Sequence, residues 1–401
     1  MRRIYPLRMS TTDHSPPLAA ITVIDLGRVL SAPFATSVLA SLGARVIKVE
    51  RPGIGDDSRA FGPHLNGKSL YFTSVNCDKE SIALDLKNLD DRKTFEALLD
   101  VADVLVENFS PTVMENFGYG WETLHARWPR LIYGALSGFG KTGPLSPLPS
   151  YDIIAQALSG MMSLTGHPHS PPVRVGASIG DLVAGLYMAL GVTSAIHKRT
   201  RTGEGCLIDI AMLDCQIAFL EAAVTTFTAT NVVPAARGTR HPSIAPFQAF
   251  LCADRWIVIA AGNDALFSSL CGVIGHPELA THQNFSTNAK RIAMIDELDR
   301  ELTLLLATRS AQEWIDRLTQ VGVPCAAIQS IDEMVAMPQV IAREMIVPVD
   351  DPALGTTHVP GNPIKMSSVT PRTSRGRAPD LDQNRLGILG ELANRKTKGK
   401  G

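Results

Sequence analysis

One acidic residue stands at the start of a long apolar stretch. Residues 171–199 read PPVRVGASIGDLVAGLYMALGVTSAIHKR, and beyond Asp181 apolar residues occupy every side of the expected helix. Such a helix is buried, and we expect it to be too short to cross a membrane. Asp181 either caps the helix or presents a carboxylate that the helix dipole keeps ionised. In the second case Gly180 and Gly185 would let a substrate come close.

A second group of polar residues follows successive short apolar segments. The positions are Arg28, Arg51, Lys87, Asn108 with Ser110, and the run Ser137-Gly138-Phe139-Gly140-Lys141. Cations, amide donors and glycines at one edge suit an anionic, phosphate-bearing ligand. Each residue taken singly is more simply a solvated loop residue, but together they predict a binding site.

The elements that must position these residues alternate between strands and helices. Apolar runs predict strands at 21–26, 45–50, 81–86, 103–107 and 131–136, with helices at 33–42 and 90–101 and a short helix from Pro111. This alternation is typical of a parallel α/β sheet, which binds ligands at the carboxyl ends of its strands. The first strand is not followed by GxGxxG, so ordinary dinucleotide binding is disfavoured.

The second half of the chain has a different pattern. A hairpin is expected at 247–253 and 256–261, followed by helices at 264–274, 291–308 and 311–321. We therefore predict a disordered leader at 1–20, a large Rossmann-like domain at 21–225, a small α+β domain at 226–330, and a return segment at 331–401 that completes the large domain. The charged residues from Arg395 to Gly401 are expected to form a disordered tail.

Composition excludes several classes of protein. A net charge of −1 argues against nucleic acid or an anionic membrane as the main partner. The six cysteines are scattered, without a CxxC pair, so neither disulfides nor a structural zinc are expected. The first eighteen residues contain no apolar segment typical of a secretory signal. We expect a cytoplasmic protein, with the mitochondrial matrix as the alternative in a eukaryote.

Six ordered segments together resemble a known family. They are VIDLGRVLSAPFATSVLASLGARVIKVERPGIGDDSR, NCDKESIALDLK, ADVLVENFSPTVMENFG, LIYGALSGFGKTGP, YDIIAQALSGMMSLTG and RTRTGEGCLIDIAMLD. They look like successive motifs of the class III CoA-transferases, which include formyl-CoA transferase and carnitine CoA-transferase. The resemblance runs from about Ile21 into the 390s. It places the family's nucleophile at Asp181 and so favours the reactive carboxylate over the helix cap.

The resemblance implies a covalent mechanism. The carboxylate attacks an acyl-CoA thioester to give a mixed anhydride, and an aspartyl-CoA thioester and a second anhydride follow. Water must be excluded, because it would hydrolyse the anhydride. CoA and its thioesters are then substrates, and neither a metal nor a prosthetic group is implied. The resemblance also implies an interlocked homodimer in which each chain threads through the other, and the long linkers around 200–240 and 325–370 would permit it.

The family's CoA contacts carry over to a defined set of positions. These are Leu30, Ser31, Arg51, Leu84, Lys87, Asn108, Phe109, Ser110 and the loop Gly138-Phe139-Gly140 with Lys141. Asn116 stands where the family often has an arginine, and Cys77 and Glu80 replace basic residues. We therefore expect weaker CoA binding, or phosphates held by Lys79 or Lys141. The glycine-rich loop that closes over the anhydride in formyl-CoA transferase has no evident counterpart.

Two alternatives stay open. An α-methylacyl-CoA racemase uses a His and an Asp as two bases, but Tyr151 stands where that histidine would fall, and tyrosine is a poor base at neutral pH. A non-catalytic CoA-binding protein is the second alternative.

The acid substrate is predicted from one further segment. RGTRHPSIAPFQAF…WIVIAAGND resembles the branch that includes succinyl-CoA:glutarate CoA-transferase. A second carboxylate on the acid would need cations or donors, for which Arg174, Arg237, Arg240 and His241 are the candidates. We therefore predict transfer of CoA from succinyl-CoA to a dicarboxylic acid.

Overall fold

The computed structural model describes residues 14–398, which form two compact units. The large unit comprises residues 14–161, 175–222 and 338–398, and the small unit comprises 162–174 and 223–337. Most of the expected leader, and residues 399–401 of the expected tail, lie outside the described residues. The units change at 222/223 and 337/338, near the expected domain boundaries of 225 and 330, which stay predictions.

A parallel six-stranded sheet forms the centre of the large unit. Its order is β5-β2-β1-β6-β7-β8, and every neighbouring pair is parallel, as the alternation of strands and helices predicted. The strands are β1 (Thr22–Asp25), β2 (Arg45–Glu50), β5 (Lys79–Ala83), β6 (Val104–Glu107), β7 (Ile132–Ser137) and β8 (Leu207–Ala211).

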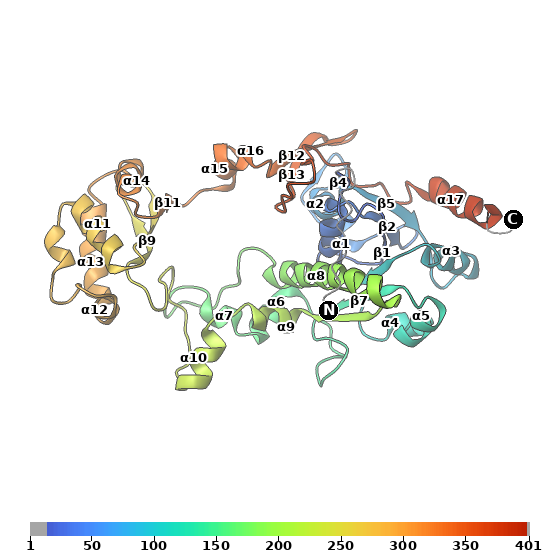
Figure 1. Ribbon diagram of the computed structural model, residues 1–401, viewed down its shortest axis with the longest axis horizontal. Coiled ribbons are helices and arrows are strands. Elements are labelled where there is room, and N and C mark those ends of the chain that lie inside the picture. The colour runs from blue at the N-terminus through green and yellow to red at the C-terminus, as the bar shows by residue number, and fades with distance from the viewer. Residues whose placement is uncertain (1–13, 399–401) are drawn as a thin grey trace, which may run out of the picture. The chain divides into compact units, whose positions relative to one another are not determined.

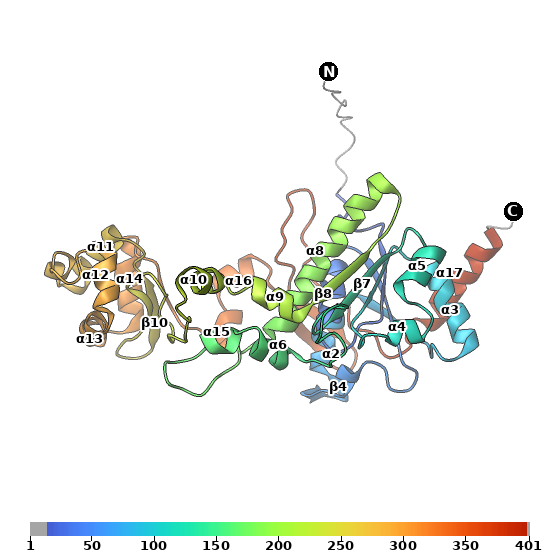
Figure 2. The ribbon, with the colours of Figure 1, turned by 90° about the horizontal axis from the view of Figure 1, so that it is seen from below.

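Helices cover both faces of this sheet because side chains alternate along each strand. Val23 and Val46 pack with helices on one face, whereas Ile24 and Ile47 pack with helices on the other. Figure 2 shows α8 on one side of β7 and β8, with α3 and α5 on the other. The first face is covered by α1 (Ser31–Ser41), α8 (Ile179–Thr202) and α9 (Met212–Ala218), and the second by α3 (Leu89–Leu99), α4 (Val113–Asn116) and α5 (Trp121–Arg127).

The strand order reverses direction between β1 and β6. From β1 the chain builds outward through β2 and β5, and then returns to add β6, β7 and β8 on the opposite side. The loops that leave β1 and β6 therefore diverge and leave a crevice at the carboxyl edge, where open α/β sheets bind ligands. Arg28 lies in the loop that follows β1, and Asn108 lies in the loop that follows β6.

The central helix α8 packs along α1, as Figure 1 shows. Val183, Met188 and Val192 are buried, but Leu186 is 48% exposed and Leu190 60%. The expectation of burial on all sides is therefore wrong for one face. The expected length is also wrong: with 24 residues, α8 is long and apolar enough to cross a membrane by length and composition alone. Its buried face marks it as a core helix.

Shorter elements complete the large unit on its N-terminal side. They are η1 (Asp57–Ala60), β3 (His64–Leu65), β4 (Lys68–Ser69), α2 (Leu70–Asn76) and α6 (Asp152–Leu158), while α7 (Met161–Leu164) lies at the boundary between the units.

The small unit combines an antiparallel sheet with helices around its own apolar core. The expected hairpin is confirmed, because β9 (Phe247–Leu251) pairs antiparallel with β10 (Trp256–Ala260), and β11 (Cys325–Ala327) adds to the other edge of β10. Phe250, Leu302 and Trp314 lie in this core. The helices are α10 (Ala223–Thr230), α11 (Asp264–Ile274), η2 (Pro277–Ala280), α12 (Asn288–Ala293), α13 (Ile295–Leu306), α14 (Ala311–Gln320) and α15 (Ile331–Val335).

The C-terminal segment returns to the large unit. It contains α16 (Pro338–Ala342), the hairpin β12 (Ile346–Asp351) and β13 (Gly355–Pro360), and α17 (Arg385–Lys398). Backbone N–H groups of Ser81 and Ala83 on β5 donate to the side chains of Asn384 (2.9 Å) and Asp382 (2.6 Å). The open edge of the sheet is thereby covered.

Three expected boundaries need correction. The helix expected over 291–308 is two helices, α12 and α13, that meet at Met294. Residues 395–398 of the expected disordered tail belong to α17. Within the expected leader, Leu18 is buried and its N–H donates to the carbonyl of Leu42 (3.0 Å), so this part is folded.

Candidate active site

A cleft of about 700 Å³ opens at the carboxyl edge of the sheet, within the large unit. Its walls come from the segments that follow β1, β2, β5, β6 and β7 and from the start of α8. Of the residues predicted from the family, it brings together Leu30, Ser31, Arg51, Leu84, Lys87, Asn108, Phe109, Ser110, Gly138 and Asp181. Phe139, Gly140 and Lys141 are not among its lining residues.

Asp181 lies inside the first turn of α8 rather than at its cap. The N-cap position is Ser178, so the capping role considered for Asp181 is excluded by position. The carboxylate is directed to the cleft, whose lining includes it. A carboxylate in the first turn is favoured by the helix dipole.

The surroundings of Asp181 nevertheless favour its protonated form. Burial raises the pKa of this carboxyl to about 7, the charge of Asp152 adds to the rise, and a hydrogen bond from Ser31 opposes it. A carboxyl with a pKa of about 7 is about half ionised at neutral pH, and loss of hydration is the main cause of the rise. The expectation that the helix dipole keeps Asp181 ionised stays a prediction.

The two glycines near Asp181 serve packing within the protein. A Cβ on Gly180 would lie 2.3 Å from Nε2 of Gln216, and one on Gly185 would lie 2.8 Å from the carbonyl oxygen of Ser31. Both separations are shorter than atoms tolerate. Gly185 thus lets α8 approach α1 closely, and neither glycine is needed to admit a substrate.

Asp152 fixes the start of α8. Its Oδ1 accepts the N–H of Gly180 (2.7 Å), the residue before the nucleophile, and its Oδ2 accepts from Nε2 of Gln156 (2.8 Å). Asp152 is only 7% exposed. Asp152 is therefore a buried carboxylate whose charge acts on the half-buried Asp181, and no role for it was predicted from the sequence.

Two arginines at the cleft compete for one carboxylate. Arg28 and Arg51 both form ion pairs with Asp57, at 3.7 Å in the case of Arg51. Arg51 remains 58% exposed, and Lys87, which follows the neighbouring strand β5, is also exposed. Arg51 and Lys87 are therefore accessible cations for an anionic ligand, in a cleft whose lining also includes acidic residues.

A buried charge cluster lies beneath the cleft, and it accounts for Lys79. The Nζ of Lys79 is fully buried and donates to Asp25, Thr36 and Asn76, each at 2.9 Å. Its donors also reach the carbonyl of Pro33. Lys79 therefore has no capacity to hold a CoA phosphate, and that expectation is wrong.

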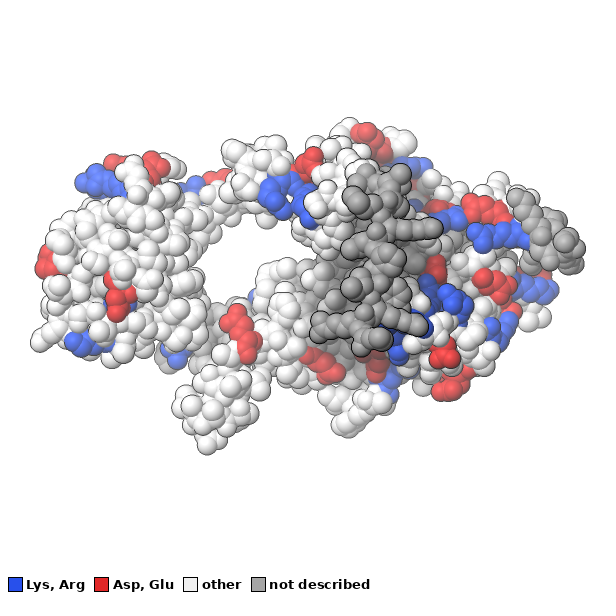
Figure 3. Space-filling view, viewed as in Figure 1, with Lys and Arg blue, Asp and Glu red and all other residues white. Residues whose placement is uncertain are grey.

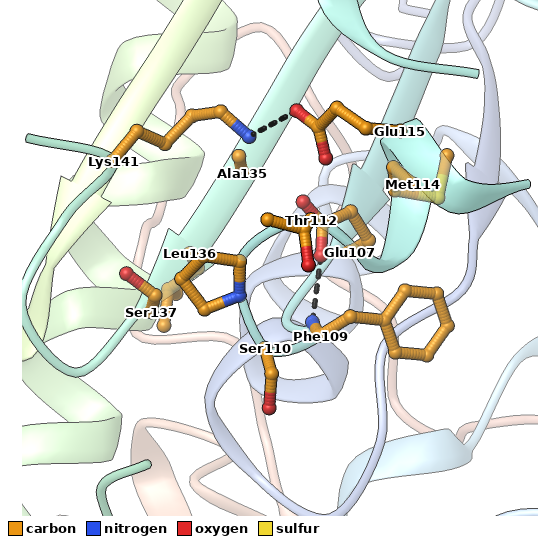
Figure 4. A pocket seen from close by; sticks show the side chains of 11 residues that line it. Glu107, Phe109, Ser110, Thr112, Met114, Glu115, Ala135, Leu136, Ser137 and Lys141 are labelled. Atoms are coloured by element: carbon orange, nitrogen blue, oxygen red, sulfur yellow. Dashed lines mark hydrogen bonds and ion pairs between the residues drawn. The ribbon is translucent and has the colours of Figure 1, made fainter. Parts of the chain in front are cut away.

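Lys141 lies in a small pocket beside the cleft. Figure 4 shows its side chain reaching Oε1 of Glu115, at 3.3 Å. Deeper in the pocket, Glu107 accepts the N–H of Phe109 (2.6 Å) and the hydroxyl of Tyr133 (2.8 Å). Burial raises the pKa of Glu107 to about 7. Contact of Lys141 with phosphate stays a prediction that requires the Glu115 ion pair to open.

The residues at the positions that depart from the family have structural partners. Glu80 accepts from Nε and Nη2 of Arg45 at 2.6 and 2.8 Å. Cys77 is buried, and its thiol donates to the carbonyl of Thr73. Asn116 is exposed at the end of α4. Sequence reasoning treated these positions as lost phosphate contacts, whereas Glu80 and Cys77 stabilise the fold.

The four candidates for binding the acid all belong to the small unit. Arg240 donates to Asp296 (2.8 Å) and forms a second ion pair with Asp299. His241 packs against Phe247, with ring centroids 5.2 Å apart, while Arg174 and Arg237 are exposed. Their role in binding an acid stays a prediction, and for Arg240 it requires exchange of a carboxylate partner.

Other functional candidates escaped the sequence reasoning. The pKa of Tyr71 is raised by burial and then by the charge of Asp181, so the two side chains interact electrostatically. No spacing in the sequence connects Tyr71, Asp152 and Asp181, because three separate helices bring them together. Asp25 carried a usable signal, since an acid at the last position of a buried strand lies at the edge of the sheet where ligands bind.

On the face in Figure 3, basic and acidic side chains are interspersed over the large unit rather than gathered in one basic patch. Within residues 14–398, His, Cys, Asp and Glu side chains do not gather in a set that could hold a metal ion. Independence from metals and prosthetic groups stays a prediction.

Fold and site thus define an α/β protein with a half-buried carboxylate at a cleft of about 700 Å³ in the carboxyl edge of a parallel sheet. The sequence profile of CoA-transferase family III matches residues 18–385, and the chain belongs to this family. It is an enzyme of the CoA-transferase class.

Two characterised relatives match over nearly their whole length. The chain is 44% identical to acetyl-CoA:oxalate CoA-transferase of Acetobacter aceti, with 97% of this chain and 99% of that protein covered. It is 36% identical to human succinyl-CoA:glutarate CoA-transferase, with 96% and 87% covered. Among solved structures, a CAIB/BAIF family protein from Brucella suis matches with a TM-score of 0.84 and 34% identity, over 94% of this chain and 99% of that one.

Proposed function

We propose that this enzyme transfers CoA from an acyl-CoA donor to a dicarboxylic acid, with Asp181 as the covalent nucleophile. One observation carries the proposal. Asp181 is a half-buried carboxylate in the first turn of the central helix, and it lines a cleft of about 700 Å³ that also contains the exposed cations Arg51 and Lys87. This arrangement supports the reaction of a large anionic thioester with a nucleophile that is partly shielded from water.

The proposed chemistry balances without another reactant. A carboxylate oxygen of Asp181 attacks the thioester carbonyl, the C–S bond breaks, and CoA thiolate leaves a mixed anhydride. The thiolate then attacks the aspartyl carbonyl and releases the donor acid. The acceptor carboxylate displaces CoA from the aspartyl thioester, and the thiolate attacks the new acyl group to regenerate Asp181.

Dicarboxylates are favoured as acceptors on the strength of the relatives. Oxalate and glutarate, named in the two relatives, are both dicarboxylic acids. The donor is proposed to be succinyl-CoA, as in the relatives that act on glutarate and mesaconate. Acetyl-CoA is a second candidate donor, because the 44% identical relative uses it.

The test is product analysis with a panel of substrates. Acetyl-CoA and succinyl-CoA are each offered with oxalate, glutarate and mesaconate, and with pentanoate as a monocarboxylate of glutarate's length. A charge-assisted contact to the second carboxylate should favour glutarate over pentanoate by roughly tenfold to a hundredfold in kcat/KM. Mass spectrometry of the CoA products identifies the pair. Equal efficiency for glutarate and pentanoate would refute a dicarboxylate site.

The contribution of Arg240 is tested separately. Arg240→Met should erase most of the preference for glutarate while sparing pentanoate, if Arg240 exchanges an aspartate partner for the acid. The matched control is Arg255→Met, which breaks an ion pair with Glu333 elsewhere in the small unit (2.8 Å). An unchanged preference would leave Arg240 with a structural role only.

We also propose a homodimer. Its support within the large unit is a set of exposed apolar side chains on adjoining helices: Leu186 and Leu190 on α8, Ile217 on α9, and Phe219 directly after α9. Exposed apolar surface of this kind is typical of protein–protein contacts. Light scattering at micromolar concentration should give twice the monomer mass of 43.1 kDa, and a monomer would refute the proposal.

A further inference from the structure

The hydroxyl of Ser31 has its direction set by a neighbour. Ser31 is the first residue of α1, is 3% exposed, and lines the cleft. Its Oγ accepts a hydrogen bond from Nδ2 of Asn108 at 3.0 Å. Because a hydroxyl has a single proton, the proton of Ser31 is free to be donated to a different acceptor.

The orientation of Asn108 is itself fixed by the backbone. Its Oδ1 accepts the N–H of Arg28 (2.7 Å), and its Nδ2 donates to the carbonyl of the same residue (2.9 Å). In a flipped amide, the NH₂ group would face the N–H of Arg28, so that two donors meet. The amide oxygen would face the carbonyl of Arg28, so that two acceptors meet. Nδ2 must therefore face Ser31, and Ser31 cannot donate to Asn108.

The available acceptor is the nucleophile. The backbone of Ser31 lies against Gly185 on α8, so close that a Cβ there would be 2.8 Å from the Ser31 carbonyl oxygen. Gly185 is one turn beyond Asp181, and both Ser31 and Asp181 line the cleft. The Ser31 hydroxyl lowers the pKa of the Asp181 carboxyl, which is the effect of a donor directed at a carboxylate.

We propose that Ser31, oriented by Asn108, donates its hydroxyl proton to Asp181 and holds the nucleophile ionised and in place. The inference rests on the proposed function of Asp181. It assigns Ser31 and Asn108 a positioning role beyond the CoA contact predicted from the family, in which the hydroxyl forms no bond to substrate.

The need for such a donor follows from the other groups around Asp181. The charge of Asp152 on α6 repels that of Asp181, and both carboxylates raise the pKa of Tyr71 on α2. Gln216 on α9, beside Gly180, is uncharged. Burial raises the pKa of Asp181 to about 7, and Ser31 is the group that lowers it. Without the hydroxyl, fewer molecules would carry the reactive carboxylate at neutral pH.

The test is the pH profile of kcat/KM from pH 5 to 9 for Ser31→Ala, in the full-length enzyme with the best substrate pair of the panel. Loss of a hydrogen bond to a charged group should move the acidic limb up by about one pH unit. The variant should then be about tenfold slower at pH 6 and equal to the unmutated enzyme near pH 9. Ser37→Ala is the matched control, since Ser37 lies on the same helix and its hydroxyl meets Arg375 (3.3 Å).

A second variant covers the case in which Ser31→Ala folds poorly. Ser31→Cys keeps a weak donor of similar size. The acidic limb of its kcat/KM profile should therefore lie between the limbs of the unmutated enzyme and of Ser31→Ala. An unmoved limb, whether the rate falls equally at every pH or does not fall, would overturn the role of Ser31. Absence of transfer by the unmutated enzyme with every substrate pair would instead overturn the proposed function, and the inference with it.

Discussion

Two aspartates of the large unit, the buried Asp25 and the half-buried Asp181, behave in opposite ways. Both lie at the carboxyl edge of the sheet, and burial raises the pKa of each carboxyl in the absence of other effects. For Asp25, burial is outweighed by Lys79 and Lys48, and its pKa lies below the ordinary value. For Asp181, the neighbours are another carboxylate and a hydroxyl, and its pKa rises to about 7.

The difference shows how one sheet edge separates stability from reactivity. Asp25 accepts from Gly27, Thr36 and Lys79, at 2.7, 2.7 and 2.9 Å, so its lone pairs are occupied and its charge is neutralised. Such a carboxylate is a poor nucleophile. Asp181 has no such cation partner and keeps an oxygen available to an incoming carbonyl.

The largest expected effect comes from removing the nucleophile. Asp181→Asn keeps the side-chain shape but cannot form an anhydride, so transfer should fall at least about a thousandfold. Retention of transfer within tenfold of the unmutated enzyme, with deamidation excluded by mass spectrometry, would show that Asp181 is not the nucleophile.

The same variant should not lose stability. The pKa of Asp181 is higher in the folded protein, about 7, than the ordinary value of 3.8, so its contribution to stability is complete below pH 3.8 and is lost as the pH rises through 7. An uncharged Asn avoids that loss. At pH 8 the melting temperature of Asp181→Asn should equal or exceed that of the unmutated enzyme, and a large decrease would favour a structural role.

The second largest effect is expected on stability, from breaking the ion pair between Asp25 and Lys79. Lys79→Met leaves the charge of Asp25 buried and deprived of its closest cation, which should lower the free energy of unfolding by about 3–5 kcal/mol. Urea unfolding followed by circular dichroism measures it. Lys93→Met is the control, because Lys93 forms a surface ion pair with Asp90. Equal midpoints for the two variants would remove the distinction between the two aspartates.

The smallest effect is expected on the pH dependence of transfer, from removing the charge that raises the pKa of Asp181. Asp152→Asn removes the like charge beside Asp181 but keeps an oxygen for the N–H of Gly180. The acidic limb of kcat/KM should then move down by up to about one pH unit, opposite to the shift for Ser31→Ala. Asp214→Asn, an exposed carboxylate on α9, is the control. A limb that moves up would contradict the repulsion.

The sheet and the cleft could be predicted from the sequence because their signals are local. Buried strands read as apolar runs, and parallel strands bring whatever follows them to one edge. Arg51 and Asn108 therefore met in the cleft as expected. The partners of Lys79 and Arg240 could not be predicted, because the aspartates that hold them are 54 and 59 residues away in the chain. The pKa of Asp181 is set by burial, by Asp152 and by Ser31, with no cation among these causes. A sequence motif does not show which charged groups the fold brings near a residue.

The contacts of Asp382 and Asn384 with β5 have a consequence for how the chain is made. Strand β5 is an edge of the sheet, and the acceptors for its N–H groups at Ser81 and Ala83 lie about three hundred residues later in the chain. During synthesis the ribosome exposes this edge until the last segment emerges, and an exposed edge is a template for pairing with other chains. A polypeptide truncated before residue 380 should therefore aggregate, even though it contains every residue of the cleft.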